Sequence, residues 1–277
     1  MRYPDRTVRR YYDERGRRLV YAEEEATPDF WDARWAIDDD VLRRRLERPG
    51  HSFTVPVTRR HLAPGDGPIL EGGCGRAVHV AALRAAGYRC VGIDSAARTV
   101  DAVRRVAPDL DVRTGDVRAI EAPDGAFAGY WSIGVIEHFY EGYDPILDEA
   151  ARILRDGGVF FLVFPHLSPL RKLRAAAGTY PRNEGRPEGF YQFALDPGRV
   201  RRDVEARGFV LVEQRPRAGV HGLYEELGPV GRILDPIRTS QNRAMRLVRG
   251  GLSRVLAGVA GHSMLQVYRK DAGAARC

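Results

Sequence analysis

The chain has 277 residues and a formal net charge of +7, which suits one large domain, or one domain with appendages, rather than two full-sized domains. Its 44% apolar and 29% charged residues are ordinary for a globular protein and exclude a disordered or fibrous chain. Three cysteines without a CxxC pair exclude a disulfide framework and a cysteine zinc site, and the longest apolar run, residues 159–164, is far too short to span a bilayer.

Cysteine usage and the first residues of the chain bear on its location. Sparse cysteines favour a reducing compartment. The basic N-terminal residues are interrupted by Asp5, Asp13 and Glu14 and are followed by no apolar segment, so they predict neither a signal peptide nor a transit peptide. We therefore expect a cytoplasmic protein without a membrane partner.

The positive charge comes almost wholly from arginine, since only Lys172 and Lys270 among the 44 basic residues are lysines. The arginines are spread along the chain among acids. Nucleic-acid binding is usually marked by a dense basic stripe with aromatic residues. The distribution therefore disfavours a nucleic-acid partner and favours genome composition as the source of the arginine bias.

Residues 1–60 are rich in Arg, Tyr and Trp. Within them Trp31, Trp35, Leu42 and Leu46 recur near helical spacing. We expect this segment to form a helical cap, which could also act as a lid over a ligand.

From residue 61 onward, short apolar runs alternate with amphipathic segments. The first predicted strand ends at residues 69–70. The other predicted strands span residues 90–93, 110–113, 127–133, 159–164, 209–214 and 264–268. The predicted helices span residues 77–86, 96–106, 145–154 and 196–207. This alternation predicts an α/β fold with a Rossmann-like, doubly wound, mostly parallel sheet of seven strands over residues 61–277.

Two segments interrupt that pattern. Residues 165–192 are punctuated by proline and glycine and predict a long loop that serves as a lid. Residues 219–261 form a second insertion, with a basic amphipathic helix over residues 229–259. Its apolar face consists of Met245, Val248, Leu252, Val255 and Val259. We expect this face to pack on the sheet or in a homodimer, with membrane-surface binding as the alternative.

A glycine-rich turn, residues 71–77 (EGGCGRA), follows the first predicted strand of the domain. Glycines at such a turn let a ligand approach the backbone closely. The turn lacks the Gly-Lys-Ser/Thr of a P-loop, and Val78 stands where the dinucleotide fingerprint has its third glycine. Because Glu71 would repel a pyrophosphate, the turn favours a positively charged ligand. S-adenosylmethionine, with its ammonium and sulfonium groups, is such a ligand.

Two further acids follow the next two predicted strands. Asp94 comes 19 residues after Gly75, near the spacing at which Rossmann-like units hold a ribose. Asp116 follows the third strand and could accept a hydrogen bond from an adenine amino group. Ligands of such folds bind at the carboxyl ends of parallel strands, so the three acids together predict one site.

Three segments resemble class I S-adenosylmethionine-dependent methyltransferases of the small-molecule type. They are residues 69–75 (ILEGGCG), 132–139 (SIGVIEHF) and 151–158 (ARILRDGG), which are similar to the first motif, the segment after the fourth strand and the turn into the fifth strand of that family. The resemblance implies S-adenosylmethionine as the cofactor. It also implies that the cofactor is lined by Glu71, Gly73, Gly75, Asp94, Ser95, Asp116, Val117 and Ser132.

Methyl transfer is an in-line displacement in which positioning and exclusion of water supply most of the catalysis. A general base is needed only when the nucleophile carries a proton of high pKa. His138 and His166 follow the fourth and fifth predicted strands, and an imidazole that titrates near neutrality suits that role. Tyr191 is a third candidate, although its aromatic surroundings also suit a pocket wall, and His221 is a weaker one.

The sequence therefore predicts methylation of an O or N atom of a small organic molecule, as occurs in secondary metabolism, without a metal. An RNA methyltransferase is one alternative, but residues 132–135 (SIGV) stand where amino-methylating nucleic-acid enzymes carry an Asn/Asp-Pro-Pro-Tyr motif. A non-catalytic, cofactor-binding partner subunit is the other.

Overall fold

The computed structural model describes residues 8–50, 52–182, 185–240 and 242–272. The chain divides into two compact units. Unit 1 comprises the residues up to 25, residues 163–201 and residues 213–266, and unit 2 comprises residues 26–162, residues 202–212 and the residues from 267 onward. Residues 1–7 and 51 of the predicted cap, 183–184 of the predicted loop, 241 of the predicted basic helix and 273–277 of the predicted α/β domain lie outside the described residues.

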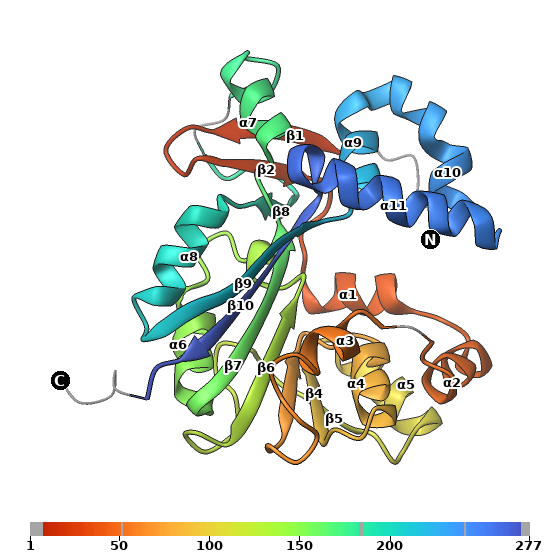
Figure 1. The fold of residues 1–277 in the computed structure, drawn as a ribbon, viewed down its shortest axis with the longest axis vertical. Helices are drawn as coiled ribbons and strands as arrows, with labels where there is room; N and C mark the ends of the chain where they lie inside the picture. Colours follow the sequence, from red (N-terminus) through yellow and green to blue (C-terminus); the bar gives the residue numbers. More distant parts are fainter. Residues whose placement is uncertain (1–7, 51, 183–184, 241, 273–277) are drawn as a thin grey trace. The chain divides into compact units, whose positions relative to one another are not determined.

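Unit 2 contains the alternating strands and helices predicted from the sequence (Figure 1). Its strands are β3 (Ile69–Gly72), β4 (Cys90–Asp94), β5 (Asp111–Thr114) and β6 (Phe127–Ile133). Its helices are α1 (Pro28–Trp35), α2 (Asp39–Glu47), α3 (Thr54–Thr58), α4 (Val78–Ala85), α5 (Ala97–Val106) and α6 (Asp144–Ile153). The short 3-10 helix η1 (Ile136–His138) follows β6.

Buried side chains explain why these segments fold as they do. Every residue of β6 except Ile133 is buried, as expected of a central parallel strand. The indole of Trp131 stacks on Phe161 at a centroid distance of 4.4 Å, and its Nε1–H donates to Thr58 Oγ1 at 3.0 Å. The core of unit 2 therefore anchors β6, the strand whose carboxyl end was predicted to reach the cofactor.

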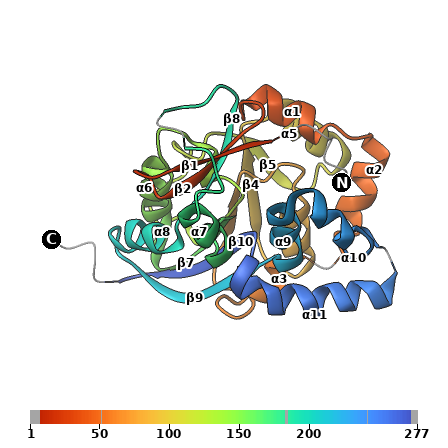
Figure 2. The same cartoon turned by 90° about the horizontal axis from the view of Figure 1, so that it is seen from above.

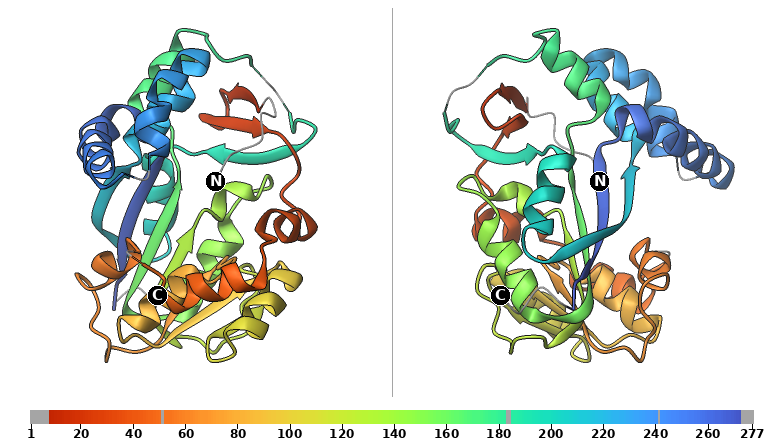
Figure 3. Two further views of the ribbon diagram at one scale, coloured as in Figure 1. Left: turned by 90° about the vertical axis from the view of Figure 1, so that its right-hand side faces the viewer. Right: turned by 60° about the vertical axis from the view of Figure 1, so that its left-hand side comes forward.

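Unit 1 has a sheet of its own, in which β1 (Arg9–Asp13), β2 (Arg18–Ala22) and β8 (Phe190–Ala194) pair antiparallel in the order β1-β2-β8 (Figures 2 and 3). Its helices are α7 (Pro169–Ala176), α9 (Gly219–Leu227), α10 (Asp235–Thr239) and α11 (Arg243–Ala260), with the 3-10 helix η2 (Gly228–Leu234). A hydrophobic cluster backs this sheet and includes Leu19, Tyr21, Leu167, Tyr180 and Ala194.

Four elements have residues in both units: β7 (Leu154–Pro165), α8 (Pro197–Glu205), β9 (Phe209–Arg217) and β10 (Ser263–Lys270). The three strands complete a seven-stranded sheet in the order β5-β4-β3-β6-β7-β10-β9. The pairs β3–β4, β3–β6 and β4–β5 are parallel. The predicted Rossmann-like fold with its seven strands is confirmed.

The N-terminal segment differs from its prediction. Residues 9–22 form the hairpin β1–β2 instead of helix, and only residues from Pro28 onward are helical. The aromatic residues of the hairpin pair across strands, with Tyr11 opposite Val20, so their spacing reflects a sheet. The hairpin belongs to unit 1, whereas helices α1 to α3 belong to unit 2.

The two insertions also differ in part. The predicted loop at 165–192 contains helix α7, begun by a Ser168 side-chain cap before Pro169, and the start of β8. The range 229–259 of the predicted basic helix is divided among η2, α10 and α11. Of these, α11 is the long helix, which packs against α9 and buries Ala257 and Ala260. Val248, Val255 and Val259 of the predicted packing face are exposed, because the helix turns its small residues to α9. Among the described residues, no helix combines the length and apolar character that crossing a membrane requires.

Candidate cofactor site

The glycine-rich turn leaves β3 in a conformation that other residues rarely adopt. Gly73 and Gly75 have φ values of +70° and +49°, and the N–H groups of Gly73 and Cys74 donate to the Ile93 carbonyl at 2.8 and 3.0 Å. A Cβ on Gly73 would lie 2.5 Å from Val135 Cγ2. The turn is therefore held against β4 by backbone hydrogen bonds. Its positive φ values favour glycine at positions 73 and 75, and at Gly73 a side chain would also collide with Val135.

Asp94, at the end of β4, organises this turn. One carboxylate oxygen accepts the Gly75 N–H at 2.7 Å, and the other accepts the Ala96 N–H at 2.9 Å. The side chain is buried, and burial raises the pKa of its carboxyl despite these two hydrogen bonds. The carboxylate has about four lone-pair sites, so it can still accept a hydrogen bond from a ribose hydroxyl.

Two polar atoms beside the turn are buried without a hydrogen-bond partner: Glu71 Oε2 and Ser132 Oγ. Glu71 is 2% exposed and Ser132 is fully buried. Burial, together with the charge of Asp94, raises the pKa of Glu71 well above its ordinary value. A buried carboxyl that lacks a counter-charge is suited to a ligand that supplies a cation or a hydrogen-bond donor.

The remaining predicted cofactor residues lie at the ends of β4 and β5. Ser95 is exposed, Val117 is buried, and Asp116 is half-buried. The Asp116 carboxylate accepts hydrogen bonds from the guanidinium of Arg118, the shortest at 2.7 Å, and these bonds lower its pKa. Asp116 is thus already paired, so its predicted hydrogen bond to an adenine would compete with Arg118.

Helix α1 is fastened to this region by one buried acid. Asp32 Oδ1 accepts hydrogen bonds from the backbone N–H and the hydroxyl of Thr99 at 2.7 and 2.9 Å, and Oδ2 accepts two from Arg98. Burial raises the pKa of Asp32, but these hydrogen bonds outweigh it and the net pKa is lowered. Sequence reasoning missed Asp32, because a single acid on a helix gives no signal of burial.

The anchored helix places two indoles at the turn. Ring atoms of Trp35 lie 3.2 to 3.6 Å from the position of a Cβ on Gly75. Trp31 stacks on Trp35 at 5.8 Å and meets the ring of His138 edge-on at 4.8 Å. In unit 2, therefore, the glycine turn, the aromatic residues of α1 and His138 form one contiguous site.

Glu137, directly before His138, is a second buried acid without a partner for one oxygen, Oε2. It is 1% exposed, and burial raises its pKa to about 8. Sequence reasoning assigned it no role, although an acid directly after Val135-Ile136 was a signal for burial. Glu137 is thus predominantly protonated at neutral pH.

The other three predicted catalytic candidates, His166, Tyr191 and His221, lie in unit 1. His166 is 2% exposed, and burial, assisted by the charge of Arg171, lowers its pKa to about 3. The expectation that this imidazole titrates near neutrality is therefore wrong. Tyr191 is a half-buried residue of β8 that packs against the hydrophobic cluster of unit 1.

The residues of unit 2 fit S-adenosylmethionine on structural grounds. Gly73 and Gly75 add no side chain of their own to the turn, and the buried acids Glu71 and Asp94 lie beside it. This arrangement suits a cation better than a phosphate, because a bound positive charge would offset the burial that raises the pKa of both carboxyls.

Comparisons with known proteins agree with this interpretation. The family model of a methyltransferase domain matches residues 70–162. A probable S-adenosylmethionine-dependent methyltransferase of Mycolicibacterium smegmatis is 32% identical over 98 residues. That match covers 35% of this chain and 38% of the relative, so it spans well under half of either protein.

Two solved structures share the fold. A chain from the Haloferax volcanii complex that contains the Trm112 methyltransferase activator is 18% identical, with a TM-score of 0.56 over 87% of this chain and 97% of that one. The [4+2]-cyclase SpnF is 18% identical, with a TM-score of 0.50 over 83% and 81%. Residues 70–162, which include the end of the glycine-rich turn's strand, Asp94 and His138, are thus similar to a methyltransferase domain.

Proposed function

We propose that the protein transfers a methyl group from S-adenosylmethionine to an oxygen or nitrogen atom of a small organic molecule. The observation that carries this proposal is the pair of buried acids, Glu71 and Asp94, at the glycine-rich turn inside the matched domain. Bound there, the cofactor would supply an electrophilic methyl group on a sulfonium. Glu71, Gly73, Gly75, Asp94, Ser95, Asp116, Val117 and Ser132 would hold it.

The role of the chain's own residues follows from their chemistry. Glu71 would balance the positive charge of the cofactor in a buried site, where charge interactions are strong. Asp94 would accept ribose hydroxyls while it holds the turn through Gly75. Trp31 and Trp35 on the anchored helix α1 would exclude water from the site.

We propose His138 as the general base for an acceptor that carries a proton. It is half-buried and meets Trp31 edge-on, so its ring is oriented within the site of unit 2. Glu137 is protonated near neutrality and would serve as a hydrogen-bond donor rather than a base. His166 is a poor base, because a pKa of about 3 gives it little affinity for a proton.

The distribution of charge favours a small acceptor over a nucleic acid. Several arginines of unit 2 are held by acids: Arg105 contacts Asp39 at 2.8 Å, and Arg152 contacts Glu149 at 2.7 Å and Asp124 at 2.9 Å. Arginines neutralised in this way contribute less to a basic surface for phosphates. The fold alone does not decide the activity, since the solved [4+2]-cyclase shares it.

Two experiments test the proposal. Calorimetric titration with S-adenosylmethionine, its demethylated product and NAD should give binding of the first two only, near −8 kcal/mol for a micromolar ligand. Labelled-methyl transfer into a cell extract should then put the label into molecules that pass a small-pore filter. Label retained with RNA would favour the nucleic-acid alternative, and binding without any transfer would favour the non-catalytic subunit.

A further inference from the structure

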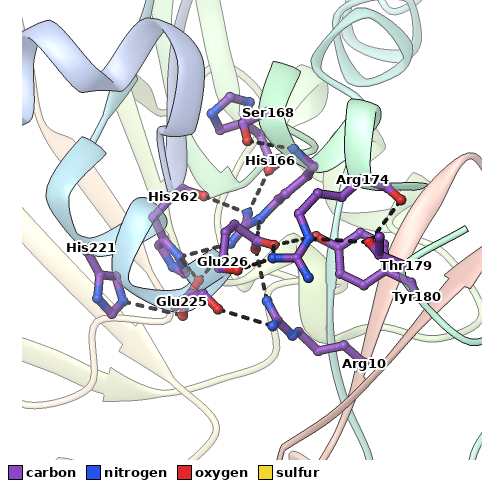
Figure 4. A network of polar contacts seen from close by, with 11 residues as sticks. Arg10, His166, Ser168, Arg174, Thr179, Tyr180, His221, Glu225, Glu226 and His262 are labelled. Carbon is purple, nitrogen blue, oxygen red and sulfur yellow. Dashed lines mark hydrogen bonds and ion pairs between the residues drawn. The ribbon is translucent and has the colours of Figure 1, made fainter. Parts of the chain in front are cut away.

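Unit 1 contains a polar network with three side chains that can chelate a metal (Figure 4). His221 and Glu225 lie one turn apart on α9, and His262 lies in the turn that leads into β10. One ligand atom from each lies within 4.8 Å of the others. His221 Nε2 is 3.5 Å from Glu225 Oε1, and His262 Nδ1 is 2.9 Å from Glu225 Oε2.

Secondary and tertiary structure both contribute to this convergence. Residues i and i+4 of a helix share one face, which brings His221 and Glu225 together. The ring of His262 lies 4.5 Å from that of His221. The side chains of His221, Glu225 and His262 are 30%, 23% and 19% exposed, so an ion from solvent can reach them.

Arg171 fixes the carboxylate from its other side. This fully buried guanidinium donates to Glu225 Oε2 at 2.7 Å and to Glu226 Oε1 at 3.0 Å. Such an outer partner orients a ligating carboxylate and leaves Oε1 directed toward His221. Its positive charge also opposes a cation, so the imidazoles must supply most of the binding.

The donor set selects the kind of ion. Calcium and magnesium prefer several oxygen ligands, whereas imidazole suits zinc, nickel, cobalt and copper. Two histidines and one carboxylate are a common set for zinc, with a fourth position open to water.

We propose that His221, Glu225 and His262 bind one divalent transition-metal ion, with zinc as the reference ion. The ion would tie α9 to the turn that leads into β10, within unit 1. The sequence predicted no metal, because His262 lies 37 positions after Glu225 and no short ligand motif joins them.

The test uses the full chain without an affinity tag, dialysed against a chelator. Calorimetric titration with zinc chloride should give one ion per chain, and cobalt should give the absorption bands of a nitrogen-ligated ion. Loss of a group that only orients a metal ligand weakens metal binding by roughly 10- to 100-fold. His221→Gln and His262→Gln each remove a direct ligand, so each should weaken zinc binding by at least as much. His61→Gln, outside the cluster, should leave the affinity unchanged.

A second readout is independent of titration heats. Zinc should raise the unfolding midpoint of the wild-type chain, since an ion bound only by the folded state stabilises it. It should raise the midpoint much less in the double variant His221→Gln/His262→Gln, whose midpoint without metal establishes that it folds. Absence of zinc binding by the wild-type chain, or equal binding by the wild-type and double-variant chains, would overturn the proposal.

Discussion

The carboxylate of Asp94 accepts the backbone N–H of Gly75 across 2.7 Å, so a residue predicted to hold the cofactor also holds the turn that receives it. Its second oxygen accepts the N–H of Ala96 at the start of α5. A substitution at Asp94 must therefore affect folding as well as binding.

Asp94→Asn should lower the free energy of unfolding by about 1–3 kcal/mol, because one buried N–H loses its acceptor. It should also weaken binding of the demethylated cofactor product. Denaturant unfolding and calorimetry measure the two effects. Asp111→Asn on the neighbouring strand is the matched control, since its contact with Arg113 is exposed and should contribute less than about 1 kcal/mol. Weaker binding with unchanged stability would show that the turn does not need Asp94.

Gly73→Ala tests the steric requirement of the turn. The left-handed conformation should cost about 1–2 kcal/mol, and the new Cβ would meet Val135 Cγ2 at 2.5 Å. The variant should lose stability and cofactor affinity. Gly73→Ala/Val135→Ala removes the collision but keeps the backbone strain, so its affinity should lie between those of Gly73→Ala and Val135→Ala. No difference between the single and double variants would mean that the collision is relieved elsewhere.

Glu137 should make stability depend on pH. Its pKa rises from 4.5 to about 8 on folding, so the folded state binds the proton more tightly. The contribution of Glu137 to the free energy of unfolding is therefore fully present below pH 4.5 and is lost as the pH rises toward 8. The loss is at most about 5 kcal/mol. Glu137→Gln should abolish this decline in unfolding measurements at pH 5 and pH 8.5, whereas the exposed Glu141→Gln should keep it. A parallel decline in both variants would assign it to other groups.

Asp32→Asn should loosen helix α1 without unfolding the domain. An amide cannot accept all four hydrogen bonds from Thr99 and Arg98, so amide hydrogen exchange over residues 28–35 should accelerate. Affinity for the demethylated product should fall, because Trp35 would no longer be held at Gly75. Asp29→Asn, on the same helix but almost fully exposed, should change neither measurement. Faster exchange with full affinity would show that α1 does not cover the ligand.

His138→Ala should lower single-turnover methyl transfer by roughly 100- to 10,000-fold if the acceptor is a hydroxyl, with cofactor affinity nearly unchanged. The wild-type rate should fall toward acid pH, and this dependence should disappear in the variant. His166→Ala should leave the pH dependence in place, because the pKa of His166, about 3, lies below the range of the assay. Wild-type rates and pH dependence in His138→Ala would mean that catalysis rests on positioning alone.

The sequence by itself determined the sheet and the turn of unit 2, because their signals are local. Apolar runs of strand length, each followed by an amphipathic segment, predict parallel strands with connecting helices. Glycines at positions 73 and 75 mark a backbone conformation closed to other residues. The shared location of the acids at strand ends, such as Asp94, could also be predicted, because parallel strands bring their carboxyl ends to one edge of the sheet.

Tertiary structure alone decided the burial of single polar residues and the pairing of distant segments. The strand β2 pairs with β8, about 170 residues away, and that pairing converts an expected helical segment into a sheet. The hydrogen bond from Thr99 to Asp32 and the contact between His262 and Glu225 depend on tertiary packing, which the periodicity of the sequence does not predict. Burial then sets the pKa of His166 and Glu137, because desolvation depends on which chain segments surround a group rather than on its neighbours in sequence.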